Sequence, residues 1–428
     1  MTDIAELDAR HVWHPFTQAA TAPPPVVMVG GRGAELIAAD GRAYLDMVSS
    51  WWVNLHGHAH PAIAAAIAAQ AGRLEQVLFA DFTHEPAVRL AARMASLLPG
   101  DLDRVFYSDD GSTAVEVALK MAWQVWANRG EPRRRFVAFD GGYHGDTLGA
   151  MSVGAASGYF RAWKDLLVPV DAAPFPATWE GCDPRAGEAA SLDAVDRLLA
   201  PGDVAAVIVE PLVQGAAGMR MCRPEFLRAL ADLVRARGSL LVLDEVMTGF
   251  GRTGAHFACL KAGIQPDLVC LSKGLTGGFL PLSMTVASEA LYREFLGPDL
   301  GRAFLHGHSY TANPLGCAAG LASLDLLLDP ACQARIEAIE AFHRARLAKV
   351  APRWRPRLCG TIAALDLGEG GYGSDLAPRL KRFFLDRGLL LRPLGPTIYL
   401  LPPYCVDDGQ LGRAWDAVGE AIGLFAPP

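Results

Sequence analysis

The chain has 428 residues, of which 51% are hydrophobic and 20% are charged, and its formal net charge is −7. This length and balance predict a globular protein of about two to three domains, and the acidic charge argues against nucleic acid or an anionic membrane as partner. The eight cysteines are scattered without a metal-finger spacing, and neither a signal peptide nor a membrane span is recognisable, so we expect a cytoplasmic protein.

In chain order, residues 1–55 hold short apolar pieces that are broken by prolines. Short apolar runs then alternate with helical patterns, which predicts an α/β domain whose strands are joined by crossover helices. The expected strands are 105–107, 135–139, 205–209, 240–244, 267–271 and 282–287, and two of the expected helices are 113–126 and 224–238. After about residue 325, arginine-rich amphipathic helices and a strand at 398–403 predict a second, smaller α+β domain.

The strongest chemical signal lies in DEVMTGFGRTG (244–254) and DLVCLSKGLTGG (267–278). Asp244 and Lys273 each follow a predicted strand, at the edge where open α/β sheets bind their ligands. The other lysines lie in polar or amphipathic segments, so Lys273 is the candidate for forming an imine. A lysine imine with a carboxylate partner indicates pyridoxal phosphate chemistry, because an acidic residue keeps the ring nitrogen of that cofactor protonated. A structural salt bridge between the two residues is the alternative.

Such a cofactor also needs a phosphate cradle and an aromatic cover. Gly111 and Ser112 begin a predicted helix, so their N–H groups can bind an anion, although a plain serine cap has the same pattern. Tyr143 lies in GGYHGDT after another strand and is suited to stacking on a flat ring, although it could also be a packing residue. Other polar or small residues at strand ends or in glycine-containing segments are Glu210, Gln214, Gly307 and Ser309.

The segment SSWWVNLHGHAHP (49–61) combines two adjacent tryptophans with His56, His58 and His60. In an extended chain the three imidazoles would share one side, so a metal site, as in a zinc hydrolase, is an alternative. No carboxylate lies nearby in the sequence and the HExxH spacing is absent, so we interpret the histidines as turn and packing residues and expect no metal. The tryptophans are either core residues or the wall of a ligand pocket.

Taken together, these motifs resemble the class III (ω-type) aminotransferases of fold type I over nearly the whole chain. The resemblance implies a homodimer that uses pyridoxal 5'-phosphate. It also implies a large domain at 56–324 with a mostly parallel seven-stranded sheet, and a small domain from both termini, 1–55 and 325–428. It makes Lys273 the imine-forming residue and proton shuttle, Asp244 the partner of the ring nitrogen and Tyr143 the stacking ring. It places Gly111, Ser112, Glu210 and Gln214 around the cofactor, with Gly307 and Ser309 reaching in from the partner subunit.

Within this class, five segments are most similar to the family of diaminopelargonic acid synthases of biotin synthesis. They are HVWHPFTQ (11–18), SSWWVNLHGHAHP (49–61), GGYHGDTLGAMSVG (141–154), LLRPLG (390–395) and IYLLPPY (398–404). This resemblance implies transfer of an amino group from S-adenosylmethionine to 8-amino-7-oxononanoate, giving 7,8-diaminononanoate. It implies that Arg392 pairs with the substrate carboxylate beside Tyr399. The remaining implied substrate residues are Phe16, Trp51, Trp52, Tyr143, Arg252, Lys273 and Gly307.

Phe16 leaves a second amino donor open. Family members that use S-adenosylmethionine carry tyrosine at this position, and relatives with WxPFTQ and HGHSYTGN segments include enzymes that use lysine. The pair of tryptophans favours S-adenosylmethionine. Two further alternatives are another class III aminotransferase that acts on an ω-amino acid or a diamine, and a non-catalytic binding module in which Lys273 is idle.

Overall fold

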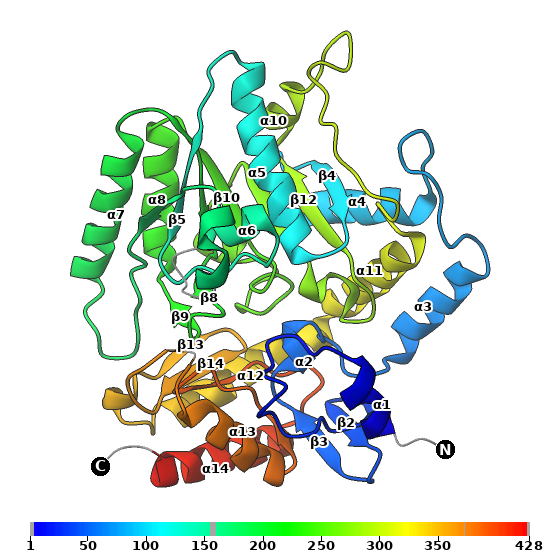
Figure 1. Ribbon diagram of the computed structural model, residues 1–428, viewed down its shortest axis with the longest axis vertical. Coiled ribbons are helices and arrows are strands. Elements are labelled where there is room, and N and C mark those ends of the chain that lie inside the picture. Colours follow the sequence, from blue (N-terminus) through cyan, green and yellow to red (C-terminus); the bar gives the residue numbers. More distant parts are fainter. Residues whose placement is uncertain (1–3, 155–159, 372, 426–428) are drawn as a thin grey trace.

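The computed structural model describes residues 4–154, 160–371 and 373–425, and a seven-stranded sheet forms its centre (Figure 1). The strand order is β4-β12-β11-β10-β7-β5-β6, and β12 is antiparallel to both of its neighbours. The mostly parallel α/β sheet expected from the sequence is therefore confirmed. In sheet order the strands are β4 (Arg104–Ser108), β12 (Ser283–Ala287), β11 (Leu268–Leu271), β10 (Leu240–Asp244), β7 (Val204–Val209), β5 (Arg135–Phe139) and β6 (Asp171–Ala173).

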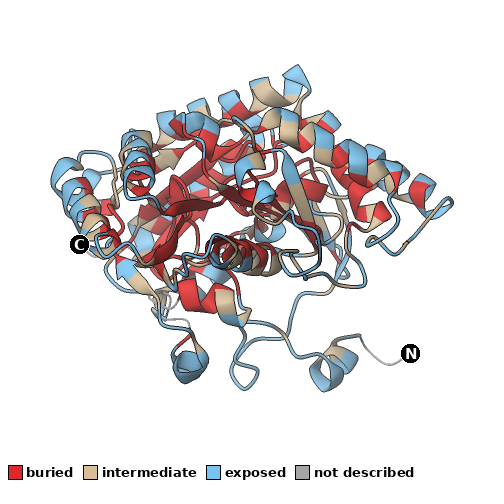
Figure 2. Cartoon of the chain, turned by 90° about the horizontal axis from the view of Figure 1, so that it is seen from above, coloured by how far each residue is buried: buried red, intermediate tan, exposed pale blue. Residues whose placement is uncertain are grey.

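Both faces of this sheet are buried. Along β10, Leu241 and Leu243 pack into one hydrophobic core, whereas Leu240 and Val242 pack into the other. Successive side chains of a strand point to opposite faces, so a strand that is apolar at every position has to be covered on both sides. Figure 2 shows the strands as a buried layer between helices whose outer faces are exposed.

Helix α5 (Gly111–Asn128) covers one face of the sheet, and α8 (Pro224–Ala236) covers the other. The predicted helices at 113–126 and 224–238 coincide with these two. The other helices that connect or flank the large sheet are α3 (Pro61–Ala71), α4 (Glu85–Leu97), α6 (Leu148–Val153), α7 (Arg185–Leu199), α9 (Ala258–Ala262), α10 (Glu289–Arg293) and α11 (Pro314–Leu327), with short 3₁₀ turns η2 (Arg161–Leu166) and η3 (Lys273–Thr276).

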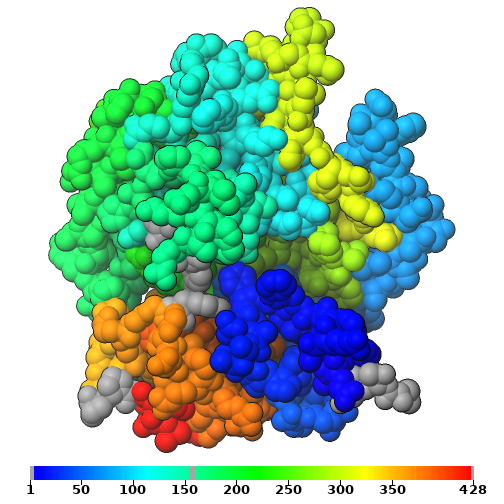
Figure 3. Space-filling model, viewed as in Figure 1, coloured from blue at the N-terminus to red at the C-terminus, as the bar shows by residue number. Residues whose placement is uncertain are grey.

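Segments from the two ends of the chain meet in smaller sheets below the large one (Figure 1). Three N-terminal strands, β1 (Met28–Arg32), β2 (Glu35–Ala38) and β3 (Ala43–Asp46), are extended by the C-terminal strand β15 (Leu389–Leu390), which is parallel to β3. Figure 3 shows the N-terminal segment lying against the C-terminal part of the molecule. The exact domain boundaries after residues 55 and 324 stay predictions.

The remaining elements complete this lower part. A second small sheet has the order β13-β14-β16, and a two-stranded ribbon joins β8 to β9. Their bounds are β13 (Arg357–Cys359), β14 (Ile362–Asp366), β16 (Thr397–Leu400), β8 (Val213–Gln214) and β9 (Arg220–Met221), and the helices are α1 (Ile4–His11), α2 (Ser49–Trp52), α12 (Pro330–Leu347), η4 (Pro352–Trp354), α13 (Leu376–Asp386) and α14 (Asp408–Phe425). Among the described residues, no single helix has the length and apolar character of a membrane span, although the bent pair α11 and α12 together meets those two criteria.

Candidate active site

The carboxyl ends of neighbouring parallel strands converge on one cavity of about 430 Å³. Asp244 is the last residue of β10, Lys273 follows β11 by two positions, and Glu210 directly follows β7. Gly111 begins α5 just after β4, and Tyr143 lies in the loop after β5. All five line the cavity, so the sheet edge that the sequence indicated does bring these distant residues together.

Lys273 is a partly buried cation beside the buried carboxylates of Asp244 and Glu210. Burial lowers the pKa of its ammonium group, and the nearby negative charges, first among them that of Asp244, offset only part of this effect. A lysine with a lowered pKa is more easily neutral, which is the form that attacks a carbonyl group. The Nζ atom also lies 5.1 Å from the centre of the Trp52 ring.

Asp244 is paired with a histidine that the sequence analysis did not single out. Its Oδ2 atom lies 2.7 Å from Nδ1 of His144, and Oδ1 accepts the N–H of Val246 at 3.1 Å. Burial alone lowers the pKa of His144, but the hydrogen bond and the charge of Asp244, with the charge of Glu210, outweigh it and raise the pKa. The position next to Tyr143 in GGYHGDT was the available signal, since that loop was already placed at a strand end.

Two buried glutamates fix the loops around this pair. Glu210 accepts the N–H of Tyr143 and that of Gly215, both at 2.9 Å, and burial raises the pKa of its carboxyl to about 7. Glu245, which the sequence analysis did not assign, accepts two N–H groups at the start of α9. Each glutamate thus holds a loop in place by satisfying backbone donors.

The start of α5 has the geometry of an anion cradle. Asp110 caps the helix, because its side chain accepts the N–H of Thr113 and its carbonyl accepts that of Ala114. The first four N–H groups of a helix have no partner within it, so those of Gly111 and Ser112 remain directed toward an incoming anion. A side chain at position 111 would lie 2.7 Å from Val246, which explains the glycine. The phosphate role of this turn stays a prediction.

Aromatic rings close the cavity on two sides. The half-buried Tyr143 stacks on Phe160 with the ring centres 6.2 Å apart, and its hydroxyl donates to Asp146 at 2.9 Å. On another side Trp52 is buried and donates from Nε1 to the hydroxyl of Tyr399 at 3.0 Å. A flat ligand in this cavity would therefore meet aromatic groups from two different parts of the fold.

A second, partly exposed group of aromatic residues lies around Trp51. The ring of Phe16 meets that of Trp51 edge to face at 5.7 Å, and the guanidinium of Arg392 lies 4.2 Å from the centre of the same indole. The side chain of Trp51 is 38% exposed, whereas Trp52 is 5% exposed. The two adjacent tryptophans therefore lie in different environments: Trp51 faces Arg392, and Trp52 faces Lys273.

Eight residues that the sequence analysis assigned to the site do not line this cavity. Four of them, Phe16, Trp51, Arg392 and Tyr399, lie around or beside the two tryptophans, and the other four are Arg252, Gln214, Gly307 and Ser309. Arg252 is fully buried, and its guanidinium donates to the backbone carbonyls of Trp52, Asn54 and Pro402. Gln214 donates to the carbonyl of Asp140. Gly307 and Ser309 lie exposed in the loop before α11. The roles assigned to all eight residues stay predictions.

The three histidines of SSWWVNLHGHAHP have separate partners. His56 is buried against Ser323, and burial lowers its pKa to about 3. His58 contacts Asp46, and His60 precedes the first residue of α3. Within the described ranges, no group of three or more histidine, cysteine, aspartate or glutamate side chains is arranged to hold a metal ion.

The residues of the cavity fit pyridoxal 5'-phosphate. A partly buried lysine with a lowered pKa suits an imine, a buried carboxylate at a strand end suits the ring nitrogen, and the start of α5 suits a phosphate. The hydrogen bond to His144 orients the Asp244 carboxylate, which would pair with the protonated ring nitrogen of the cofactor. The group would be held by Lys273, Asp244, Gly111 and Ser112.

Comparison with known proteins supports the same family. Residues 16–422 match the family described as "Aminotransferase class-III". The chain is 57% identical to an adenosylmethionine-8-amino-7-oxononanoate aminotransferase of Synechococcus elongatus over 96% of this chain and 98% of that protein. It is 39% identical to a protein of the same name from Geobacter sulfurreducens over 98% of this chain and 97% of that protein.

Solved structures with the same fold cover nearly the whole chain. The adenosylmethionine-8-amino-7-oxononanoate aminotransferase of Methanocaldococcus jannaschii superposes with a TM-score of 0.90 at 32% identity, covering 98% of each chain. An amine transaminase from an uncultivated Pseudomonas species in the PLP-bound form gives 0.89 at 30% identity, covering 97% of this chain and 99% of that chain. An ω-transaminase of Thermomicrobium roseum superposes with a TM-score of 0.92 at 28% identity, covering 98% of this chain and 97% of that chain. Enzymes with different names therefore share this fold, and the fold alone does not identify the substrate.

Proposed function

This chain belongs to the class III aminotransferases, which depend on pyridoxal 5'-phosphate, and we propose that it transfers an amino group from S-adenosylmethionine to 8-amino-7-oxononanoate. The product would be 7,8-diaminononanoate, an intermediate of biotin synthesis. The observation that carries the proposal is the 57% identity, over 96% of the chain, to the Synechococcus protein of that name.

The chemistry divides between the cofactor and the chain. Bound pyridoxal phosphate supplies an aldehyde that takes up the amino group and a ring that accepts electrons during proton removal. With the cofactor bound, the neutral amine of Lys273 would accept the proton from the reacting carbon and return it as an ammonium group, and its lowered pKa favours the neutral form that accepts the proton. Asp244, oriented by its hydrogen bond to His144, would pair with the protonated ring nitrogen of the bound cofactor.

The aromatic side of the cavity suits the oxo-acid. A long carbon tail with a carboxylate end favours apolar walls and one cation at the far end. Trp51 and Trp52 provide the walls, and the guanidinium of Arg392 above Trp51 provides the cation that can bind a carboxylate through two hydrogen bonds. Because Lys273 lies beside Trp52 and Arg392 beside Trp51, an extended acid would run along the tryptophan pair.

Both substrates use the same cavity in turn, in a ping-pong reaction. The test concerns the amino donor, because relatives with phenylalanine at the position of Phe16 include enzymes that use lysine. The purified, cofactor-loaded enzyme should be mixed in turn with S-adenosylmethionine, lysine, an ω-amino acid and a diamine, with 8-amino-7-oxononanoate as acceptor. We expect 7,8-diaminononanoate to form with S-adenosylmethionine at the highest specificity constant.

Two results would contradict this proposal in different ways. Faster turnover with lysine would keep the acceptor and replace the donor. Turnover of an ω-amino acid or a diamine with pyruvate, without any reaction of 8-amino-7-oxononanoate, would assign the chain to the other branch of the class, which the ω-transaminase fold match allows.

We further infer a homodimer in which Gly307 and Ser309 complete the cavity of the partner subunit. The loop that carries them is exposed and includes the apolar side chains of Leu305 and Tyr310, which are 72% and 64% exposed. Exposed apolar residues of this size are typical of an interface. Sedimentation of the loaded enzyme should give twice the monomer mass of 45.6 kDa, and a monomer with full activity would contradict the inference.

A further inference from the structure

The turn that carries the two tryptophans has a strained backbone. Ser49, Ser50 and Trp52 have φ values of 51°, 61° and 69°, in the left-handed region that favours glycine. Ser50 also has a ψ of −81°, which is close to the classic γ-turn, a rare and strained conformation. Residues in such conformations persist only where the surrounding structure holds them.

Asp46, at the end of β3, holds the first half of this turn. Its carboxylate is fully buried, and it accepts the N–H of Val48 at 3.0 Å and the N–H of Ser50 at 2.6 Å. The hydroxyl of Ser50 donates to the same carboxylate at 3.3 Å, and Nε2 of His58 lies 3.0 Å from it. The strained residue Ser50 is therefore bound by both its backbone and its side chain.

The orientation of His58 follows from its neighbours. The N–H of Gly57 donates to Oδ1 of Asn54 at 2.8 Å, so the amide nitrogen of Asn54 is the atom that faces Nδ1 of His58 at 3.1 Å. Because Nδ1 accepts this hydrogen bond, the ring proton lies on Nε2 and is donated to Asp46. The backbone N–H of His58 donates to Gly33, which anchors the histidine to the edge of the small sheet.

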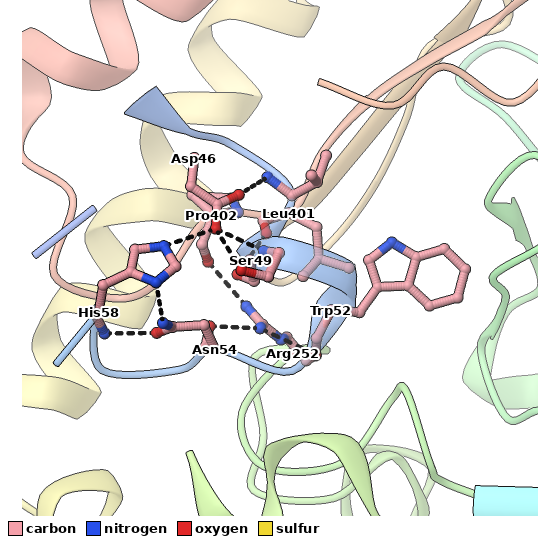
Figure 4. Close-up of polar contacts among 11 residues, drawn as sticks. Asp46, Ser49, Trp52, Asn54, His58, Arg252, Leu401 and Pro402 are labelled. Atoms are coloured by element: carbon pink, nitrogen blue, oxygen red, sulfur yellow. Dashed lines mark hydrogen bonds and ion pairs between the residues drawn. The ribbon is translucent and has the colours of Figure 1, made fainter. Parts of the chain in front are cut away.

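The second half of the turn is held from other parts of the chain. The hydroxyl of Ser49 donates to the carbonyl of Leu401 at 2.8 Å, and Arg252 donates to the carbonyls of Trp52 and Asn54 at 3.4 Å and 3.0 Å. Figure 4 shows these polar groups gathered on one side of the turn, with the indole of Trp52 pointing away from them. The polar contacts thus aim the aromatic ring to the opposite side.

We infer that Asp46 and His58 are positioning residues of the substrate site, and this inference rests on the proposed function. The pair holds the turn in its strained conformation, so that Trp51 faces Phe16 and Trp52 faces Lys273. Since the two tryptophans are adjacent, relaxation of the turn at Ser50 would displace both indoles together. Of the three histidines in this segment, the middle one therefore acts on substrate binding through the backbone.

The test compares three replacements of His58 in the full-length, cofactor-loaded enzyme. His58→Ala removes both side-chain hydrogen bonds, His58→Gln places an amide N–H near the position of Nε2, and His58→Asn reproduces only the contact to Asn54. We expect His58→Ala and His58→Asn to raise the KM for donor and acceptor about tenfold with kcat changed less than about threefold, since uniform binding is lost. His58→Gln should recover most of the KM, and the control His60→Ala, on the same segment, should leave it unchanged.

A second measurement follows the tryptophans without any substrate. In protein labelled with 5-fluorotryptophan, the ¹⁹F resonances of Trp51 and Trp52 are assigned through their phenylalanine variants. Both resonances should shift in His58→Ala and return toward their original positions in His58→Gln. If the natural enzyme failed to turn over 8-amino-7-oxononanoate, the proposed function would fail while these shifts still decided the positioning role.

A double variant connects the effect to backbone strain. Glycine tolerates the conformation of residue 50, so Ser50→Gly lowers the strain that the Asp46–His58 pair counteracts. The rise in KM caused by His58→Ala should therefore be smaller in the Ser50→Gly background than in the natural one. Unchanged ¹⁹F resonances in His58→Ala, a His58→Gln variant as defective as His58→Ala, or an equal rise in KM in both backgrounds would overturn the inference.

Discussion

Two neighbouring parts of the proposed site, which meet at Trp52, are built in different ways. The lysine side consists of ionisable groups at the ends of adjacent strands, of which Lys273 is partly buried and Asp244, His144 and Glu210 are buried. The tryptophan side, formed by Phe16, Trp51, Trp52, Arg392 and Tyr399, consists mainly of aromatic rings from three distant segments, and Phe16 and Trp51 are partly exposed.

The two parts should differ in how much the replacement of a single residue affects the enzyme. A buried charge that loses its partner leaves an uncompensated group in a medium of low dielectric constant, so a single replacement on the lysine side has a large effect. Each aromatic contact at a partly exposed site contributes little to the binding free energy, so the loss of one ring leaves the contacts of the others in place. We therefore expect replacements on the lysine side to reduce the rate and those on the tryptophan side to change mainly binding.

Lys273→Ala should have the largest effect. Loss of the amine removes both the attachment of the cofactor and the group that moves the proton, so turnover should fall by about 10⁴-fold or more, the upper range for one acid–base group. The measurement is steady-state turnover, together with borohydride reduction and mass spectrometry to find the lysine to which the cofactor is joined. The exposed Lys349→Ala is the control and should keep full activity. Full turnover of Lys273→Ala would disprove the assignment.

Asp244→Asn should have the second largest effect on turnover. The amide keeps the shape but not the charge at the ring nitrogen, so cofactor should stay bound while turnover falls by about 10²- to 10³-fold, as for other preorganised electrostatic groups. Bound cofactor is measured by absorbance and the slow step by the isotope effect on the donor carbon. Turnover at the natural rate would show that another group holds the ring nitrogen protonated.

The same variant should change the dependence of stability on pH. In the natural protein the pKa of His144 is raised by Asp244, so this pair stabilises the fold fully below the ordinary histidine pKa of about 6.5 and loses that contribution as the pH rises through the raised value. The difference in melting temperature between the natural protein and Asp244→Asn should therefore be largest near pH 6 and decrease toward pH 9. A difference that grew with pH would contradict the pairing.

On the tryptophan side, Arg392→Ala should have a moderate effect. A hydrogen bond between charged groups contributes about 1.5–3 kcal/mol, so the KM for the oxo-acid should rise about 10- to 100-fold. The donor half-reaction should change less, which single-turnover measurements of each half can separate. Arg382→Ala, on the exposed face of α13, is a matched control. Equal losses in both half-reactions would place the carboxylate contact elsewhere.

Phe16→Tyr should give the smallest effect. It adds one hydroxyl to a ring that already meets Trp51 and is 48% exposed. We expect the ratio of specificity constants for S-adenosylmethionine and lysine to shift toward S-adenosylmethionine by less than about tenfold. A shift of several hundredfold would mean that this one position decides the donor, and that the tryptophan side is as sensitive to single groups as the lysine side.

Much of the large sheet could be predicted because its strands are continuous apolar runs. LLVLD at 240–244 forms β10 with the predicted bounds, and RFVAF at 135–139 forms β5. The short strand β6 and the two-residue strands β8, β9 and β15 were not predicted, since segments of two or three residues carry no periodic pattern. They form only because a neighbouring strand supplies hydrogen bonds.

The residues of the candidate site also differ in whether the sequence could predict them. Lys273 and Asp244 could be identified from the sequence because each follows a recognisable strand, and the carboxyl ends of parallel strands meet at one edge. His144 was missed because its partner Asp244 lies 100 positions away, and no local pattern links the two. Asp46 was missed although it lies only 12 positions from His58, because their contact depends on how the chain turns back after β3.

The sequence alone therefore determined the fold class, the resemblance to a family and the residues that follow regular strands, because short-range patterns of apolar and small residues encode them. Only the tertiary structure decided which way each tryptophan faces, that Arg252 holds backbone carbonyls, and that one of three similar histidines supports the substrate wall. These features depend on contacts between segments up to about 350 positions apart, such as Ser49 with Leu401, and such contacts exist only after the core has packed.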